Sequence, residues 1–263
     1  MRWFEIALVV LTAFTGLVWL LDKLYLAKRR AATEGLLDDG KEPIVIDYSK
    51  AFFPVLLVVL VLRSFIAEPF RIPSNSMMPT LLTGDFILVN KFAYGLRLPI
   101  SNRKFVAIGE PKRGDVVVFR PPHHPDQDWI KRVMGLPGDR IGYRDNQVTV
   151  NGQLLAYEAI GSYQGTGNGT EMSGAEELRE QLPGRAHRVL ERGDSPFADP
   201  GEGEWDVPAG HYFVMGDNRD NSEDSRYWQS HFLPEENLRG KAFLIWLNID
   251  GGFDASRIGN RIE

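Results

Sequence analysis

Two serines lie two residues apart in a short polar segment, Pro73–Pro79, which contains Ser74 and Ser76. A serine hydroxyl attacks well only when a base lies within hydrogen-bond reach, and the oxyanion that forms needs hydrogen-bond donors of its own. In an extended segment, residues two apart share a face. One hydroxyl can then attack while the other donates, so the spacing favours acyl-transfer chemistry.

The sequence offers two kinds of base for such a serine. Five histidines are available, and none stands in a recognisable triad context: His123, His124, His187, His211 and His231. Strand alternation in the run Trp129–Val133 places Lys131 on one face with two apolar residues. Burial there lowers a lysine pKa by about two to three units, enough to make the neutral amine a base. A solvent-exposed Lys131–Arg132 pair on an edge strand is the alternative.

A polar stretch further along the chain, Gly216–Arg226, contains four acidic residues. Asp220, Ser222 and Asp224 alternate there, as ligands of a calcium loop do. However, no glycine occupies the sixth loop position and no glutamate the twelfth, which argues against an EF-hand. We therefore predict neither a metal ion nor another cofactor.

Two apolar stretches precede these motifs and indicate transmembrane helices. Trp3–Leu21 is interrupted only by Glu5 and, at about 1.5 Å per residue, is long enough to cross most of a hydrocarbon core of about 30 Å. Ala51–Ala67 carries Pro54 near its start and Arg63 near its end, both tolerated in a membrane helix. We expect helices over residues 1–21 and 51–67.

The intervening loop, residues 22–50, is rich in basic residues, whereas only Arg2 precedes the first span. The basic residues of the loop are Lys23, Lys28, Arg29, Arg30, Lys41 and Lys50. The positive-inside rule makes this loop cytoplasmic, with the N-terminus and everything after residue 67 outside the cytoplasm. The alternative, a cleaved signal peptide over residues 1–21, has only Met1-Arg2 as its basic start and no clear small-x-small site.

The charge balance of the external part excludes some partners. The net charge is −5, and residues 1–67 carry eight basic and seven acidic side chains, so the remainder carries −5 − 1 = −6. An acidic domain argues against nucleic acid binding. The absence of cysteine excludes disulfides and thiol nucleophiles, so folding depends on the core alone.

The external part predicts a mainly β, antiparallel fold. Short β-rich runs are separated by Gly, Pro, Asn and Asp turns: Asp85–Phe92, Asp115–Arg120, Trp129–Val133, Val148–Val150, His211–Met215 and Lys241–Leu247. We assign residues 68–151 and 207–263 to a catalytic β domain. Residues 152–206 are rich in Gly, Glu and Ser, with a helical pattern over Ala175–Leu182, and are expected to form an inserted, looser subdomain.

Three motifs, Ser74–Leu81, Lys131–Asp139 and Gly216–Arg226, resemble those of bacterial type I signal peptidase, in the same order. The resemblance covers the two-span topology and most of residues 68–150 and 208–250. It implies a Ser-Lys endopeptidase that removes signal peptides from exported preproteins after a small-x-small site. It also implies a multi-pass protein of the bacterial inner membrane with a periplasmic catalytic domain. Its partners would be preprotein signal peptides and the lipid bilayer, and could include secretion machinery.

The resemblance also implies a role for each matching residue. Ser76 would be the nucleophile, Lys131 the general base, Ser74 an oxyanion donor, and Ser222 the residue that orients Lys131. Four further residues would brace the site: Asp217, Asn218, Asp224 and Arg226. The walls of two shallow substrate pockets would come from Phe70, Ile72, Met77, Leu81, Ile87 and Ile130, for each of which ordinary core packing is the alternative.

One residue departs from the family pattern, because Asn75 stands where these peptidases usually have glycine between the two serines. Asparagine tolerates left-handed backbone better than most residues, so the turn can survive.

Two other classes of function are alternatives to the signal peptidase. A β-lactam-sensitive acyl enzyme needs Ser-x-x-Lys, but Pro79 stands three residues after Ser76. A non-enzymatic binding module would use Gly216–Arg226 as a structural turn and would tolerate loss of Ser76 or Lys131.

Overall fold

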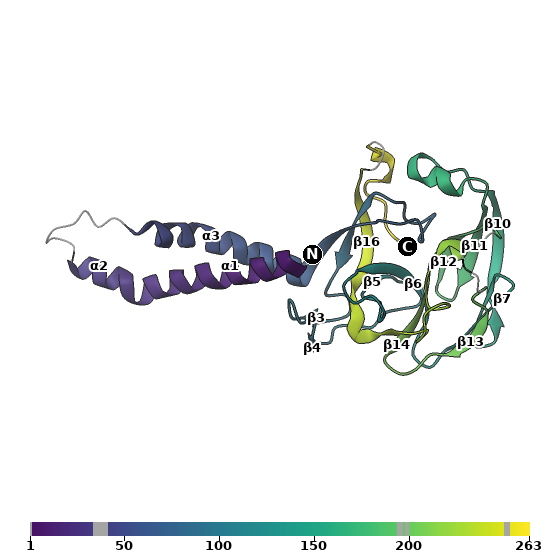
Figure 1. The fold of residues 1–263 in the computed structure, drawn as a ribbon, viewed down its shortest axis with the longest axis horizontal. Coiled ribbons are helices and arrows are strands. Elements are labelled where there is room, and N and C mark those ends of the chain that lie inside the picture. The colour runs from purple at the N-terminus through teal and green to yellow at the C-terminus, as the bar shows by residue number, and fades with distance from the viewer. Residues whose placement is uncertain (1, 34–41, 194–196, 198–199, 250–252) are drawn as a thin grey trace. The chain divides into compact units, whose positions relative to one another are not determined.

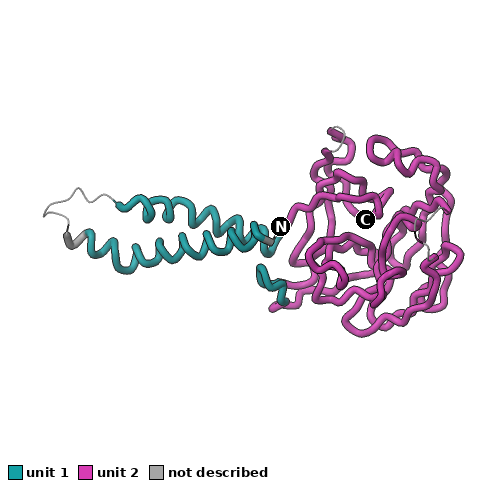
Figure 2. The backbone as a smooth tube through the Cα atoms, viewed as in Figure 1, with its two compact units in different colours: residues 1–66, 97–103 teal, residues 67–96, 104–263 magenta. Residues whose placement is uncertain are grey.

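The computed structural model describes residues 2–33, 42–193, 197, 200–249 and 253–263 (Figure 1). The chain divides into two compact units, residues 1–66 with 97–103 and residues 67–96 with 104–263 (Figure 2). The first unit is helical and the second is mainly β. Lys41, one of the basic residues counted for membrane orientation, lies outside the described residues.

The helical unit contains two long apolar helical stretches. α1 (Arg2–Leu21) continues through a π-helical turn (Asp22–Leu26) into α2 (Ala27–Thr33), and α3 (Ile44–Val61) continues through a second such turn (Leu62–Ile66). Trp3–Arg30 and Ile44–Ile66 are long and apolar enough to cross a membrane. Many of their large apolar side chains are exposed, which suits a lipid environment. The unit therefore fits a membrane-anchored protein.

These helices extend beyond the apolar runs that predict them. α3 begins at Ile44 rather than Ala51, and Lys23 and Arg30 lie on helical turns rather than in a loop. Asp22, which is buried, forms ion pairs with Arg30 at 2.6 Å and with Lys50 at 2.9 Å. These pairs compensate the buried carboxylate, so polar turns can continue the helices.

The β unit is built on a seven-stranded antiparallel sheet in the order β1-β2-β16-β5-β6-β14-β15. Its strands are β1 (Ala67–Arg71), β2 (Asp85–Asn90), β16 (Leu238–Asn248), β5 (Val116–Phe119), β6 (Trp129–Gly135), β14 (His211–Met215) and β15 (Leu233–Pro234). The predicted antiparallel, mainly β fold is confirmed. Strands overlap all six of the β-rich runs read from the sequence.

Two further antiparallel sheets of the β unit have the strand orders β13-β7-β8-β9 and β10-β11-β12 (Figure 1). Their strands are β7 (Arg140–Arg144), β8 (Gln147–Val150), β9 (Gln153–Leu154), β10 (Ala156–Ser162), β11 (Glu176–Leu182), β12 (Arg185–Glu191) and β13 (Gly203–Asp206). The remaining short elements are β3 (Leu96–Arg97), β4 (Lys104–Val106) and 3₁₀ helices over Gly167–Met172, Arg219–Asn221, Glu235–Asn237 and Ala255–Arg257.

The large sheet is buried on both faces, as β5 demonstrates. All four residues of β5 are buried, and Val116 and Val118 pack in one apolar cluster whereas Val117 and Phe119 pack in another. Because side chains alternate along a strand, the two clusters lie on opposite faces. Lys131 pairs with Val117 across the β5–β6 ladder, so the sheet carries this lysine into an apolar face.

The helix predicted over Ala175–Leu182 is wrong, because Glu176–Leu182 forms strand β11. Its alternate residues Leu178, Glu180 and Leu182 are buried, and β11 pairs with β10 on one side and β12 on the other. Pairing on two edges outweighs the modest intrinsic helix preference of glutamate, arginine and leucine. The described residues of 152–206 belong to the same compact unit as the other strands of the β unit.

Candidate active site

Ser76 and Lys131 are brought together although they lie 55 residues apart in the chain. The Lys131 ammonium nitrogen donates a 2.7 Å hydrogen bond to the Ser76 hydroxyl oxygen. Ser76 follows β1, and Lys131 is the third residue of β6. Both side chains are buried, with Ser76 8% and Lys131 4% exposed. A serine and a lysine in this contact have the geometry that a nucleophile and its base need in acyl transfer.

The surroundings of Lys131 favour its neutral form. Burial lowers the pKa of Lys131 to about 8, against the opposing pull of the Asp224 and Glu223 carboxylates. The Lys131 side-chain nitrogen lies 5.7 Å from the centre of the Trp129 ring, on the apolar face that alternation predicts, and this contact favours the charged form whereas burial opposes it. With a pKa of about 8, roughly one lysine in ten is neutral at pH 7 and about half at pH 8.

Ser74 lies beside the nucleophile, with its hydroxyl oxygen 3.5 Å from that of Ser76. Both serines line a cavity of about 650 Å³ that also reaches Lys131. The full lining is Pro73, Ser74, Asn75, Ser76, Gln127, Asp128, Trp129, Ile130, Lys131, Phe197, Asn221 and Glu223. The two side chains therefore meet at the wall of a cavity.

The loop that follows β14, Gly216–Arg226, contacts the segment Pro73–Pro79, which contains Ser76 and is called the nucleophile segment. The Asn218 backbone N–H donates to the Ser76 carbonyl oxygen at 3.1 Å, and the Asn218 side chain donates to the Asn75 carbonyl oxygen at 3.1 Å. A Cβ on Gly216 would lie 2.5 Å from the Ser76 carbonyl oxygen and 2.1 Å from the Ser222 hydroxyl oxygen. Only glycine fits this close approach.

Ser222, Asp224 and Arg226 form a buried network in the same loop. The Ser222 hydroxyl donates to Asp224 Oδ2 at 2.9 Å, and the Arg226 Nε donates to Asp224 Oδ1 at 2.9 Å. Burial opposes ionisation of Asp224, but Arg226 overcomes it and holds the pKa of Asp224 below its usual range. Among the described residues, the hydrogen-bond partner of the Ser222 side chain is Asp224 rather than Lys131.

Asp217 anchors the start of this loop to β6 through Arg132. The Arg132 guanidinium donates to the two Asp217 carboxylate oxygens at 2.8 and 2.7 Å, and the Thr80 hydroxyl donates to Oδ2 at 2.5 Å. Arg132 and Asp217 are almost completely buried. Because Arg132 follows Lys131 in the strand, its side chain points to the opposite face of the sheet. β6 thus supplies the candidate base on one face and an anchor on the other.

Sequence reasoning missed the buried cluster that continues from this anchor. Glu180 of β11 accepts a 2.6 Å hydrogen bond from Arg219, and His187 of β12 lies 3.2 Å from Glu180 and 3.8 Å from Asp217. Burial, aided by Arg132, lowers the pKa of His187 below its ordinary value. Nothing in the local sequence marks Glu180, whose burial depends on strand pairing, but Arg132 could have been found from its position beside Lys131.

Among the described residues, neither the histidines nor five of the six predicted pocket residues line the cavity at Ser76. In the described part of the chain, no histidine forms a hydrogen bond with Ser76, and His123 instead lies 3.3 Å from Glu223 at the cavity margin. All six predicted pocket residues lie in one buried apolar cluster: Phe70, Ile72, Met77, Leu81, Ile87 and Ile130. Of these, Ile130 lines the cavity at Ser76.

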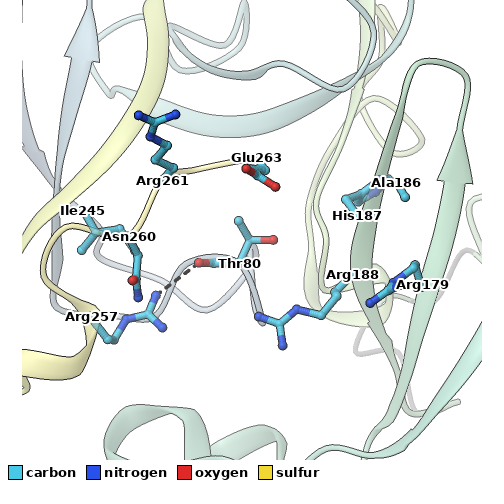
Figure 3. Close-up of a pocket in the computed structure, with 10 residues that line it drawn as sticks. All are labelled: Thr80, Arg179, Ala186, His187, Arg188, Ile245, Arg257, Asn260, Arg261 and Glu263. Atoms are coloured by element: carbon cyan, nitrogen blue, oxygen red, sulfur yellow. Dashed lines mark hydrogen bonds between the residues drawn. The ribbon is translucent and has the colours of Figure 1, made fainter.

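A second cavity, of about 520 Å³, contains neither Ser76 nor Lys131 (Figure 3). Its lining is Thr80, Arg179, Ala186, His187, Arg188, Ile245, Arg257, Asn260, Arg261 and Glu263. Arg188 pairs with Glu177 at 3.0 Å, and Arg257 pairs with Asp85 at 2.5 Å. The arginines that face this cavity thus partly serve structural ion pairs. The Ser76–Lys131 contact lies at the other cavity.

Comparison with known proteins identifies the family. A family model described as signal peptidase, peptidase S26, matches residues 45–247. Signal peptidase I of Pseudomonas fluorescens and that of Pseudomonas aeruginosa are each 45% identical over 93% of this chain and 92% of theirs. Signal peptidase I of Aquifex aeolicus is 39% identical over 74% of this chain and 81% of its own.

Among solved structures, a signal peptidase I from Enterococcus faecalis V583 matches 51% of this chain and 98% of its own, with 28% identity and a TM-score of 0.30. The assignment does not depend on this match. It rests on the family model, which covers most of the chain, and on relatives that are 45% identical along almost its whole length. The chain therefore belongs to the peptidase S26 family of signal peptidases.

Proposed function

We propose that this signal peptidase acts through a Ser76–Lys131 pair and cleaves preproteins after a small-x-small site. Membership of the family makes the chain a peptidase of signal peptides. The proposal adds the roles of Ser76 as nucleophile and Lys131 as base. The observation that carries it is the 2.7 Å hydrogen bond from Lys131 Nζ to Ser76 Oγ in a buried setting. The lowered pKa of Lys131, about 8, supports the same role.

In the proposed acylation step, neutral Lys131 takes the proton from the Ser76 hydroxyl as Oγ attacks the scissile carbonyl carbon. The Ser74 hydroxyl and the Ser76 backbone N–H donate to the oxyanion. Protonated Lys131 then passes the proton to the leaving amine as the C–N bond breaks. A water molecule, deprotonated by Lys131, then attacks the acyl-enzyme ester. The bond between the acyl carbon and Ser76 Oγ breaks, Lys131 returns the proton to Oγ, and the signal peptide leaves with a new C-terminal carboxyl group.

The loop residues brace this machinery. The Asp224 carboxylate, shared by Ser222, Arg226 and the Gly216 backbone N–H, fixes the turn beneath the pair. We assign Ser222 to the orientation of Lys131 through this turn. Asp217 and Asn218 hold the nucleophile segment, as their hydrogen bonds to Arg132 and to the Asn75 and Ser76 carbonyl oxygens support.

Substrate specificity follows from the walls of the cleft in this proposal. An extended preprotein segment would lie along the cavity, between the residues before Ser76 and those of β6, because both segments line it. Ile130 would form part of a shallow apolar wall, backed by the other five predicted pocket residues in the buried cluster, and this wall would admit small side chains and exclude bulky or charged ones. Ile130, at the cavity, is the member of that set with direct access to a substrate.

We also propose that the catalytic β unit lies on the extracytoplasmic side of the bacterial inner membrane. The distribution of basic residues around the two apolar helices supports this orientation. The chain from Ala67 to Ser76 spans at most about 30 Å even when extended, so Ser76 lies near the bilayer surface. A preprotein held there by its own apolar segment meets the site at a raised effective concentration.

The test is cleavage of a purified secretory precursor with an Ala-x-Ala site by the detergent-solubilised full chain, from pH 6 to 10. We expect cleavage after the second Ala, abolished in Ser76→Ala and in Lys131→Ala. Lys112→Ala, which removes an exposed lysine from the same domain, is the matched control. Cleavage by Lys131→Ala at the unaltered rate would mean that Lys131 is not the base and would favour a histidine in that role. No cleavage by the unaltered chain would favour the binding-module class.

A further inference from the structure

Asn75, the residue between the two serines, does not adopt the left-handed backbone that a glycine at this place would suggest. Among the described non-glycine residues, those with positive φ are Ile100, Asn102, Asp145, Asn146, Asn151 and His231, so Asn75 has an ordinary φ. The expectation that asparagine serves here by tolerating left-handed backbone is therefore wrong. What Asn75 adds over glycine is its side chain.

The Asn75 carboxamide contacts the loop that follows β14. Its Oδ1 accepts a 2.9 Å hydrogen bond from the Asn221 side-chain amide, across 146 residues of sequence. Both residues are half-buried, and both line the cavity that holds the Ser76 hydroxyl. The hydrogen bond thus closes the wall of the cavity between the nucleophile segment and the loop.

Two further hydrogen bonds run parallel to this contact. Asn218 donates its side-chain N–H to the Asn75 carbonyl oxygen and its backbone N–H to the Ser76 carbonyl oxygen, each at 3.1 Å. Asn218 therefore fixes the backbone at Ser76, whereas Asn221 fixes the side chain of the preceding residue. A residue held by both its backbone and its side chain has little freedom to rotate.

The position of Ser76 is sensitive to such freedom. Its hydroxyl oxygen must lie 2.7 Å from Lys131 Nζ, and it lies 3.5 Å from the Ser74 hydroxyl oxygen. Lys131 comes from β6, but Ser76 lies on an irregular segment with no strand ladder to hold it. A misplacement of about 1 Å at a reacting group costs on the order of a hundredfold in rate.

We propose that Asn75 and Asn221 form an amide clasp that positions Ser76 for attack, a function that a glycine at residue 75 cannot supply. The inference rests on the proposed function and deepens it. Both are positioning residues: they act on the geometry of Ser76 and take no proton. This hydrogen bond couples the conformation of the nucleophile segment to that of the loop after β14.

The clasp is tested by a double-mutant cycle on precursor cleavage by the full chain, with Asn75→Gly, Asn221→Ala and the double variant. Because each single variant breaks the same hydrogen bond, we expect each to lower kcat about tenfold with little change in KM, and the double variant to lose no more than either single variant. Thermal unfolding of the variants, followed in parallel, separates positioning from loss of fold.

Two variants of similar shape at residue 75 supply the matched control. Asn75→Asp keeps an oxygen acceptor for the Asn221 amide, whereas Asn75→Leu fills similar space with no acceptor. We expect Asn75→Leu to be the slower of the two by about tenfold.

Two results would overturn the clasp while the unaltered chain still cleaves the precursor. One is multiplicative losses of kcat in the double-mutant cycle, and the other is equal rates for Asn75→Asp and Asn75→Leu. A fall in kcat matched by an equal fraction of unfolded protein would make the contact structural only, which also overturns the inference. An unaltered chain that does not cleave would instead overturn the proposed function, and the clasp with it.

Discussion

The ionisation of Lys131 is decided by burial against a small set of charges. Burial lowers the pKa of this lysine, while the carboxylates of Asp224 and Glu223 raise it. Asp224 is fully buried and already satisfied by Arg226, whereas the Glu223 side chain is 47% exposed and lies 3.3 Å from His123. Glu223 is therefore the group whose removal changes the charge at Lys131 without breaking the buried network.

Replacement of Glu223 by Gln shifts the rising limb of the pH–kcat profile to lower pH. A carboxylate near an ammonium favours the charged form, so its removal lowers the pKa of Lys131 and increases the neutral fraction below pH 8. We expect kcat at pH 7 to rise by about twofold, a modest effect because solvent screens an exposed charge. Precursor cleavage in saturating substrate from pH 6 to 10 measures the shift.

Glu204→Gln, at an exposed site on β13, is the control and should leave the limb in place. A limb that moves to higher pH in Glu223→Gln, or that does not move at all, would mean that Glu223 does not influence the base.

The loop after β14 depends on one glycine for its approach to the nucleophile segment. The path of the chain at Gly216 leaves no room for a side chain, since a Cβ there would lie 2.5 Å from the Ser76 carbonyl oxygen, a backbone atom. The Gly216 backbone N–H also donates to Asp224 at 2.9 Å. A shift of this residue therefore disturbs both the nucleophile and the buried Asp224 network.

Gly216→Ala should lower kcat by at least about a hundredfold, because relief of the clash displaces either Ser76 or Ser222 by a substantial fraction of an ångström. We also expect the thermal unfolding midpoint to fall, since overpacking at a fully enclosed site costs about 1–3 kcal/mol. Single-turnover cleavage of the precursor and near-UV circular dichroism measure the two effects. Activity within threefold of the unaltered chain would show that the backbone can relax at no cost to the site.

Elements with a strong local pattern could be predicted from the sequence, and those that depend on pairing could not. β5 and β6 were predicted because their apolar residues and turns are local signals, and the alternation that placed Lys131 on the apolar face belongs to the same pattern. β11 was mistaken for a helix because Glu177, Arg179 and Gln181 are helix formers whose strand conformation is imposed by β10 and β12.

The site residues divide in the same way, into those that stand in local motifs and those whose role depends on a partner far along the chain. Ser74, Ser76 and Lys131 stand in motifs, so their meeting could be expected. Glu180 and Asn221 could not be placed, since each gains its role from a partner far along the chain: Arg219 for Glu180, and Asn75 for Asn221. Long-range polar pairs leave no periodic trace in a sequence.

For the molecule as a whole, an active Lys131 is a source of instability. The chain has no cysteine, so no disulfide offsets the cost of a lysine that is only 4% exposed. A buried lysine whose pKa falls from 10.5 to about 8 opposes folding at pH 7 by about 3 kcal/mol, at 1.36 kcal/mol per unit. In the proposed mechanism, stability and activity thus make opposite demands on this residue.

Lys131→Met should therefore abolish cleavage and stabilise the β unit at pH 7 by up to about 3 kcal/mol, since methionine fills similar space without a charge. Between pH 8 and 10.5 the unfolded chain holds a proton on this lysine that the folded chain does not, so the unaltered chain gains stability from Lys131 as pH rises through that window. The difference in unfolding free energy between the two chains should shrink over the same window.

Because other groups titrate there too, the informative quantity is the difference in unfolding free energy between the two chains, measured by denaturant unfolding in detergent. Lys112→Met, at an exposed site, should give a difference near zero at every pH. A Lys131→Met chain that is less stable than the unaltered one at pH 7 would show that the ammonium is stabilised where it lies, and that it is not the base.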